Sequence, residues 1–410
     1  MDSPLSYLHG LEQFGIKFGL DNISAIVARL GHPERAFRSV HVAGTNGKGS
    51  VTAMVDAALR AAGHRSARYT SPHLIDLSER FTIDGRPVVK TDLISAVVQV
   101  RDAIEGLVRD GTLDVQPTFF EATTAIAFDL FRRAGVDVAV LEVGLGGRLD
   151  ATNVVSPDVT AITSIAFDHQ KYLGTTLREI AREKAGIIKP GVPVVVGPLP
   201  DDADAVIEEI AHERGAEIVR TAADEVGTLA VGLPGIHQRA NAAVAMHILR
   251  TLDARGLSVP QAAIAQGLAQ PGWPGRLDLR RLSGGREALL DAAHNPAGAV
   301  ALASYLIEWT RGLPKPPLVF AAMRDKDVAG MFDALLPAVG SLVVTRASTP
   351  RAAAPAELAA IARRVAADTG VTVAATPGEA LAAAWQMSPR IVVAGSIFLL
   401  GDVLKLIEPT

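Results

Sequence analysis

The 410-residue chain contains no cysteine, and this absence removes several kinds of chemistry. Disulfide bridges, thiolate metal sites and a cysteine nucleophile are all excluded. Any metal ion would have to be held by hard oxygen ligands or by imidazole.

The chain also lacks a strong excess of charge and any long apolar run. Its formal net charge is −4 and its pI is about 6.2, so no general attraction to nucleic acid or to anionic membranes is expected. No stretch approaches the length needed to cross a bilayer, and Met1–Gly10 has no basic segment followed by an apolar one. We expect a soluble, cytoplasmic protein without nucleic-acid or membrane partners.

What the chain does have is ample apolar sequence, with 49% hydrophobic residues. Its length exceeds what one core usually serves, so we expect two domains. The segment 271–276, Pro-Gly-Trp-Pro-Gly-Arg, cannot continue a helix or a central strand and is the best boundary. The predicted domains are therefore residues 1–272 and 273–410.

Both halves alternate short apolar runs with helix-favouring stretches. Apolar runs at 38–43, 136–143 and 158–165 have no polar face, which is typical of parallel strands buried on both sides. The alternation restarts after the boundary, with runs at 288–290 and 318–320. The sequence predicts an α/β protein with an N-terminal, mostly parallel sheet flanked by helices, followed by a smaller Rossmann-like α/β domain.

A glycine-rich turn, Gly44-Thr45-Asn46-Gly47-Lys48-Gly49-Ser50, lies between the run ending at Ala43 and a helix expected from Val51. Such a turn lets backbone N–H groups and a helix N-terminus converge on phosphate oxygens. Lys48 would reach the β and γ phosphates, and Ser50 or Thr52 could bind Mg²⁺. The spacing differs from the usual P-loop, and the alternative is a plain tight turn. We favour a triphosphate site in the N-terminal domain.

Charged residues follow other apolar runs of the first half. Glu142 ends one run and His169 follows another, and Mg²⁺ is the natural cation to neutralise a buried Glu142. The alternatives are an arginine-paired Glu142, a His169 that is only a satisfied polar residue, and a solvated charge at Lys184.

In the second half, Asp291 and His294 precede a helix that Asn295 and Pro296 are suited to start. We expect Asp291 and His294 to face the cleft between the two domains, and Asn241 and Arg276 are further polar residues that could reach it.

Taken together, these residues give the chain a resemblance to a known family. Eleven blocks occur in the same order from about residue 15 to 402, and the sequence resembles folylpolyglutamate synthase/dihydrofolate synthase, in the Mur ligase superfamily of ATP-dependent amide ligases. The blocks that carry the resemblance are 44–50, 71–74, 118–121, 142–153, 168–175, 183–186, 237–242, 273–276, 291–296, 325–327 and 395–396.

The resemblance implies a set of site residues. It implies ATP on the loop Gly44–Ser50, including Lys48, with Asn241, Arg276 and Asp291 completing the nucleotide site. It implies two Mg²⁺ ions held by Ser50, Ser71, Glu142 and His169, with a carbamylated Lys184 beside the second metal, and a possible monovalent cation. Thr118 and Leu149 would line the pterin site, and His294 and Ser396 would lie near the incoming glutamate. The catalytic residues implied are Lys48, Glu142, His169, Lys184 and His294.

Two departures from the family pattern concern details. Ala292 stands where the family usually has glycine, and Asp21-Asn22 stand where a charged pair that includes arginine is common.

The expected reaction activates the carboxylate of dihydropteroate or a tetrahydrofolate as an acyl phosphate and joins it to L-glutamate. A carboxylate must gain a good leaving group before an amine can attack it, and charge neutralisation lets it approach ATP. Whether the enzyme adds the first glutamate, extends the chain or does both stays open, and a monomer is expected.

Two alternative functions remain. One is a Mur-type ligase of peptidoglycan synthesis, disfavoured because the loop at Gly44 comes too early for a preceding UDP-sugar domain. The other is a non-catalytic nucleotide switch, disfavoured because Asp325-Lys326-Asp327 lacks the leading Asn of a guanine-reading motif.

Overall fold

The computed structural model describes residues 4–15 and 17–408, and residues 1–3, 16 and 409–410 of the two predicted domains lie outside the described part. The chain divides into two compact units. The first unit is formed by Met1–Ile165, Thr176–Gly232 and Arg239–Gly272, and the second by Ala166–Thr175, Leu233–Gln238 and Trp273–Thr410.

The first unit is built on an eight-stranded sheet in the order β4-β3-β2-β5-β1-β6-β7-β8. Six neighbouring strands, β2, β5, β1, β6, β7 and β8, pair in parallel. Strands β3 and β4 extend the sheet beyond β2 with antiparallel pairing. The strands are β1 (Arg38–Ala43), β2 (Ser66–Tyr69), β3 (Phe81–Ile83), β4 (Arg86–Pro87), β5 (Val138–Glu142), β6 (Val159–Ile162), β7 (Val194–Val196) and β8 (Ile218–Arg220).

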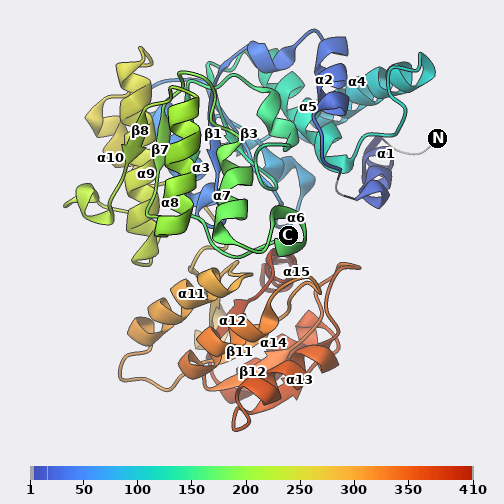
Figure 1. Ribbon diagram of the computed structural model, residues 1–410. Coiled ribbons are helices and arrows are strands. Elements are labelled where there is room, and N and C mark those ends of the chain that lie inside the picture. The colour runs from blue at the N-terminus through green and yellow to red at the C-terminus, as the bar shows by residue number, and fades with distance from the viewer. Residues whose placement is uncertain (1–3, 16, 409–410) are drawn as a thin grey trace. The chain divides into compact units, whose positions relative to one another are not determined.

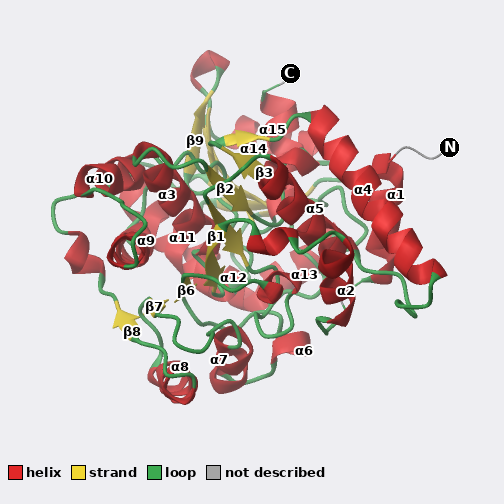
Figure 2. Cartoon of the chain, turned by 90° about the horizontal axis from the view of Figure 1, so that it is seen from above, coloured by secondary structure: helices red, strands yellow, loops and turns green. Residues whose placement is uncertain are grey.

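Helices cover both faces of this sheet (Figure 1 and Figure 2). They are α1 (Pro4–Gly10), α2 (Asp21–Arg29), α3 (Lys48–Ala61), α4 (Lys90–Arg109), α5 (Phe119–Arg133), α7 (Leu177–Ala185), α8 (Asp201–Glu213), α9 (His237–Ala254) and α10 (Gln261–Ala269). Alternate residues of β2 show the layering, because successive side chains of a strand point to opposite faces. Ala67 and Tyr69 join the core under α4 and α5, whereas Ser66 and Arg68 contact Asp56 of α3.

The second unit contains a six-stranded sheet in the order β13-β12-β11-β14-β10-β9, parallel except for the edge strand β9. Its strands are β9 (Asp278–Arg281), β10 (Glu287–Leu290), β11 (Pro317–Phe320), β12 (Ser341–Val344), β13 (Val371–Val373) and β14 (Arg390–Ala394). Its helices are α6 (Gln170–Leu173), α11 (Pro296–Trp309), α12 (Val328–Leu335), α13 (Pro355–Val365), α14 (Pro377–Met387) and α15 (Ile397–Ile407).

The core of the second unit follows from the same alternation along its strands. Leu318 and Phe320 of β11 pack with α11, α12 and α13, and α14 and α15 pack beside the same sheet. Both units therefore have helices on a mostly parallel sheet, which confirms the predicted fold class.

Local predictions differ from the structure at a few places. Helix α3 begins at Lys48 instead of Val51, so the lysine belongs to its first turn. The polar stretch around residues 79–87, for which no strand was predicted, contains the antiparallel edge strands β3 and β4. Strand β13 was missed because its residues are only half-buried or exposed and make no long apolar run. No helix among the described residues is long and apolar enough to span a membrane.

Helix α10 packs closely on α3, the helix that follows the glycine-rich loop, and Gly267 makes this approach possible. A Cβ placed on Gly267 would lie 2.4 Å from the backbone nitrogen of Ala58. Replacing Gly267 with alanine should therefore force the two helices apart.

We expect Gly267→Ala to lower the free energy of unfolding by about 1–3 kcal/mol, as overpacking does. Urea unfolding would measure the change. Gly370→Ala is the matched control, because no atom lies within 4 Å of a Cβ at Gly370. Equal stability of the two variants would contradict the close approach of α10 to α3.

Candidate active site

The glycine-rich loop leaves the carboxyl end of β1 and passes very close to two polar side chains. A Cβ on Gly44 would lie 1.9 Å from Oγ1 of Thr163, and one on Gly47 would lie 2.3 Å from Oδ1 of Asn241. Gly47 also has a φ of 87°, in the left-handed region that favours glycine. Only glycine fits at these two positions, so the loop has a fixed and specific path.

Hydrogen bonds from the segment after β6 hold this path. Thr45 N donates to Ser164 O at 2.8 Å, and Asn46 N donates to Ser164 Oγ at 2.9 Å. Thr163 Oγ1 in turn donates to Asn46 O at 2.6 Å. The loop is thus fixed by the neighbouring parallel strand, at the sheet edge where ligands of α/β proteins bind.

Two lysines converge on the same loop carbonyl. Lys48 Nζ donates to Gly44 O at 3.0 Å and to Thr45 O at 3.3 Å, and Lys184 Nζ donates to Gly44 O at 2.9 Å. Lys184 is only 5% exposed, so its reading as a solvated charge is wrong. The arrangement places two amino groups at the N-terminus of α3, where anions are favoured.

Oxygen donors lie at the ends of the strands beside this loop. Glu142, at the end of β5, is 6% exposed, and its Oε2 accepts a hydrogen bond from Ser71 N at 3.2 Å. Ser50, in the first turn of α3, is also buried. Within the described residues, no group of three His, Cys, Asp or Glu side chains forms a metal site by itself. A carboxylate with two hydroxyls suits a hard cation that keeps phosphate and water oxygens as its other ligands.

The residues predicted to line the pterin site have structural roles of their own. Thr118 caps α5, since its Oγ1 accepts from Glu121 N at 3.2 Å and donates to Glu121 Oε2 at 2.9 Å. Leu149 is half-buried and precedes Asp150, which caps the next helical turn. Capping accounts for the burial of Thr118, while its contact with a pterin stays a prediction.

A series of buried hydrogen bonds links Asp150 to His41 of β1 through Thr152. His41 Nε2 lies 2.8 Å from Thr152 Oγ1, and that hydroxyl also contacts Asp150 Oδ1, which further accepts from Thr152 N. Burial lowers the pKa of His41 to about 3, with a smaller contribution from the charge of Lys189. His41 is therefore neutral, and because the Thr152 hydroxyl donates to the carboxylate, the His41 Nε2–H donates to that hydroxyl.

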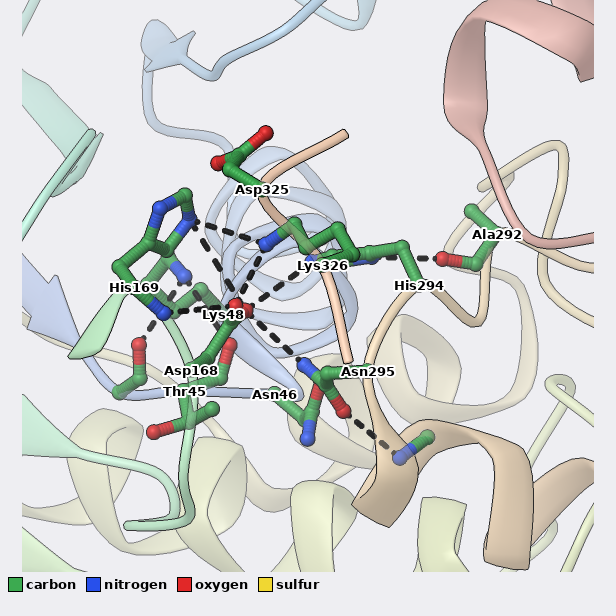
Figure 3. Close-up of polar contacts among 12 residues, drawn as sticks. Thr45, Asn46, Lys48, Asp168, His169, Ala292, His294, Asn295, Asp325 and Lys326 are labelled. Carbon is green, nitrogen blue, oxygen red and sulfur yellow. Dashed lines mark hydrogen bonds and ion pairs between the residues drawn. The ribbon is translucent and has the colours of Figure 1, made fainter. Parts of the chain in front are cut away.

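A second cluster lies in the second unit and centres on Asp168 (Figure 3). Its Oδ1 contacts Lys326 Nζ at 2.5 Å, its Oδ2 accepts from Asn295 Nδ2 at 3.1 Å, and His294 Nε2 lies 3.5 Å from Oδ2. Lys326 Nζ also lies 3.2 Å from His169 Nε2. Burial raises the pKa of Asp168, but His294, Lys326 and His169 outweigh burial and hold it well below its usual range.

The remaining predicted residues of the second unit are held by backbone contacts. Asp291 Oδ2 accepts from Leu277 N and Oδ1 accepts from Ala293 N, both at 2.9 Å. Burial raises the pKa of Asp291 against the opposing effect of Arg276. Ser396 is buried and caps α15 by accepting from Phe398 N at 3.2 Å. Asn295 caps α11, which confirms the helix start after His294.

The structure thus groups the predicted residues by unit. Ser50, Ser71, Glu142, Lys184 and Asn241 belong to the first unit with the loop, and His169, Arg276, Asp291, His294 and Ser396 belong to the second.

Sequence reasoning gave no role to Asp168 or Lys326. Asp168 directly precedes His169, and Lys326 lies in the Asp-Lys-Asp block, so both belong to blocks that carry the family resemblance, but neither had a predicted role.

Known proteins share both the sequence and the fold. The family model described as Mur ligase, glutamate ligase domain, matches residues 275–397. The dihydrofolate synthase/folylpolyglutamate synthase of Bacillus subtilis is 37% identical and covers 80% of this chain and 81% of its own. The folylpolyglutamate synthase of Lacticaseibacillus casei is 35% identical over 97% of this chain and 96% of its own.

The chain belongs to the folylpolyglutamate synthase/dihydrofolate synthase family. Solved structures of that family agree with this assignment. The Mycobacterium tuberculosis folylpolyglutamate synthase complexed with ADP and AMPPCP has a TM-score of 0.89 and 33% identity, covering 100% of this chain and 99% of its own. The Escherichia coli FolC in complex with DHPP and ADP has a TM-score of 0.86 and 30% identity, covering 99% and 98%. The two-domain Mur ligase architecture is therefore confirmed.

Relatives differ in length. A probable bifunctional folylpolyglutamate synthase/dihydropteroate synthase of Haloferax volcanii is 35% identical over 97% of this chain, but the chain spans only 49% of that protein. As a member of the folylpolyglutamate synthase/dihydrofolate synthase family, the chain is an ATP-dependent ligase of folate metabolism.

The buried His41 makes stability depend on pH in a defined direction. Its pKa is about 3 in the folded state, against an ordinary value of 6.5. Between these values the unfolded chain binds a proton that the folded protein does not, so lowering the pH favours unfolding.

We expect the free energy of unfolding of the wild type to fall by about 1.4 kcal/mol per pH unit from this group as the pH drops below 6.5. His41→Gln keeps a donor toward Thr152 without titrating, and should lose that part of the slope. Urea unfolding at several pH values would compare the two proteins. Identical slopes would show that His41 is not buried neutral.

Proposed function

We propose that this protein binds ATP on the loop Gly44–Ser50 and uses it to join a pteroyl carboxylate to L-glutamate through an acyl phosphate. The pteroyl substrate is dihydropteroate, a tetrahydrofolate or both. Residues 1–272 would form the nucleotide-binding domain and residues 273–410 the glutamate-ligase domain.

One observation carries the proposal: the backbone of the loop passes so close to Thr163 and Asn241 that only glycine fits at Gly44 and Gly47. This path leaves the N–H groups at the start of α3 and the amino group of Lys48 at one point, which is what a triphosphate requires. A plain tight turn would need neither this close approach nor a second buried lysine on the same carbonyl.

The chain's own residues would neutralise charge and align the reactants. Lys48 and the N-terminus of α3 would bind phosphate oxygens, with Asn241 beside the loop and Arg276 and Asp291 completing the nucleotide site from the second domain. Ser50, Ser71, Glu142 and His169 are the residues that would hold Mg²⁺. When bound, Mg²⁺ supplies positive charge that lets an anionic carboxylate approach the anionic nucleotide.

The remaining residues would serve the other two substrates. Thr118 and Leu149 would contact the pterin, and His294 and Ser396 would lie near the incoming glutamate. Ligands named for similar structures support this division. The E. coli structure contains DHPP and ADP. Another structure of a bifunctional folylpolyglutamate synthase/dihydrofolate synthase, 31% identical with a TM-score of 0.84, has Mn, AMPPNP and L-glutamate bound.

We further propose that the protein works as a monomer in the cytoplasm and that a monovalent cation assists the reaction. Sedimentation and the salt dependence of turnover would test the first and last of these.

The function is tested by ADP release from Mg·ATP and L-glutamate, with dihydropteroate, a tetrahydrofolate and a UDP-sugar peptide as separate acceptors. We expect turnover with at least one pteroyl acceptor and none with the UDP-sugar peptide. Lys48→Met should lower the rate at least about 100-fold, since it removes a charge aimed at the transferred phosphate. Lys90→Met, at an exposed lysine of α4, is the control and should keep the wild-type rate.

Two outcomes of this assay would contradict the proposal. Release with the UDP-sugar peptide alone would favour the peptidoglycan ligase. A wild-type rate in Lys48→Met would show that the loop does not bind the triphosphate.

We also propose that Lys184 is carbamylated. Its side chain is buried at the glycine-rich loop, and a lysine adds CO₂ through its amino group to form a carbamate. After equilibration with ¹³C-labelled bicarbonate, the protein should show a carbamate resonance by ¹³C NMR that Lys184→Ala lacks. Lys189→Ala is the matched control, because Lys189 is a half-buried lysine of the same unit. A spectrum of the wild type without a carbamate, or one unchanged in Lys184→Ala, would rule out the modification.

A further inference from the structure

Arg80 is a buried arginine to which neither the sequence nor the function assigns a role. It ends the short helical turn Leu77–Arg80 just before β3, and it is only 8% exposed. A guanidinium stays charged in proteins, and burying it is costly unless a carboxylate and hydrogen bonds compensate for the lost water.

The contacts of Arg80 compensate for this burial only in part. Its Nε donates to His73 Nδ1 at 3.0 Å, and its guanidinium carbon lies 5.1 Å from the ring centre of Phe119. No carboxylate among residues 4–15 and 17–408 forms an ion pair with it within 4.0 Å. By contrast, Arg132 and Arg133 both pair with the buried Asp129.

The charge of Arg80 is stabilised by a tyrosine in contact with it and by two carboxylates at a greater distance. Burial lowers the pKa of Arg80, and Tyr69, which also hydrogen-bonds to Arg80, opposes this effect together with the more distant carboxylates of Glu12 and Glu142. Arg80 is therefore a buried cation held by His73, by Tyr69 and by the ring of Phe119, with no ion-pair partner within 4.0 Å among the described residues.

Two aromatic side chains contact Arg80: Phe119 lies under its guanidinium, and Tyr69 forms a hydrogen bond with it. Tyr69 stacks on Phe81 with ring centres 5.8 Å apart, and it lies 6.0 Å from the ring of Phe120. Phe119, under the guanidinium, follows Thr118, which is the residue predicted to line the pterin site. A flat ligand with an anionic end would match a cation surrounded by rings.

Arg80 also lies at the corner of the sheet that carries the predicted metal ligands. Its carbonyl oxygen accepts from Thr70 N at 3.1 Å, and the next residue, Ser71, donates its N–H to Glu142. A carboxylate bound at Arg80 would therefore lie beside the oxygen donors of the first unit.

We propose that Arg80 binds the benzoate carboxylate of the dihydropteroate-type substrate, the group that becomes phosphorylated. The proposal rests on the proposed function and adds a carboxylate-binding residue to it. Two parallel N–H donors of a guanidinium match the two oxygens of a carboxylate. A benzoate bears its carboxylate directly on an aromatic ring, so a carboxylate bound at Arg80 would bring that ring near Phe119.

The experiment compares two ligands on each variant by titration calorimetry. The ligands are dihydropteroate and its des-carboxy analogue, which has a phenyl ring in place of the benzoate. We expect the wild type to prefer dihydropteroate by about 10- to 100-fold, the range of a charge-assisted hydrogen-bonded pair. Arg80→Met should bring this ratio close to one, mainly by weakening dihydropteroate, and Arg80→Lys should retain part of it.

The ratio separates recognition from structure, because a folding defect would weaken both ligands together. Arg286→Met is the matched control, since Arg286 also lies over an aromatic ring, Trp385, but is exposed in the second unit. It should keep the wild-type ratio. The thermal unfolding temperature of each variant gives a second readout.

An unchanged affinity ratio in Arg80→Met would overturn the proposal, and a lower unfolding temperature beside it would make Arg80 a structural residue. Failure of the proposed function would look different, because the wild type itself would then bind no dihydropteroate.

Discussion

The close approach of the loop backbone to Thr163 and Asn241 is the constraint on which the rest of the first unit depends. Thr163 comes from the segment after β6 and Asn241 from α9, so three distant parts of the chain meet at one turn. Side chains at Gly44 or Gly47 would separate them. The parallel pairing of β1 with β6 brings these parts together, and Gly267 seats α10 against the helix that the loop begins.

Buried charged side chains are a second feature of the structure. Glu142, Lys184 and Arg80 are all buried in the first unit, where a charged group loses its hydration and needs compensating contacts. Asp168 and Lys326 form a comparable pair in the second unit, although their direct contact satisfies much of the charge. A fold that keeps buried charges of both signs at the ends of parallel strands is arranged for anionic substrates, and it accepts a loss of stability there.

The strands and helices could be predicted from the sequence wherever local pattern and burial agree. The run 318–320 forms a buried strand because all of its residues are apolar, so neither face of the strand favours contact with water. Strands β3, β4 and β13 lie at or near sheet edges with mixed exposure, so they lack that pattern. The capping of α11 by Asn295 could be predicted because a cap depends on neighbouring residues alone.

The sequence by itself determined the fold class, the position of the glycine-rich loop and the family, because these depend on periodicity, on local turn chemistry and on the order of short blocks along the chain. Only the tertiary structure decided that Lys184 is buried against Gly44, that Lys326 pairs with Asp168, and that Arg80 lies on Phe119. These contacts join residues far apart in the chain. The sequence alone does not distinguish a charged residue in water from one in the protein interior. The packing of distant segments determines which of these two environments surrounds it.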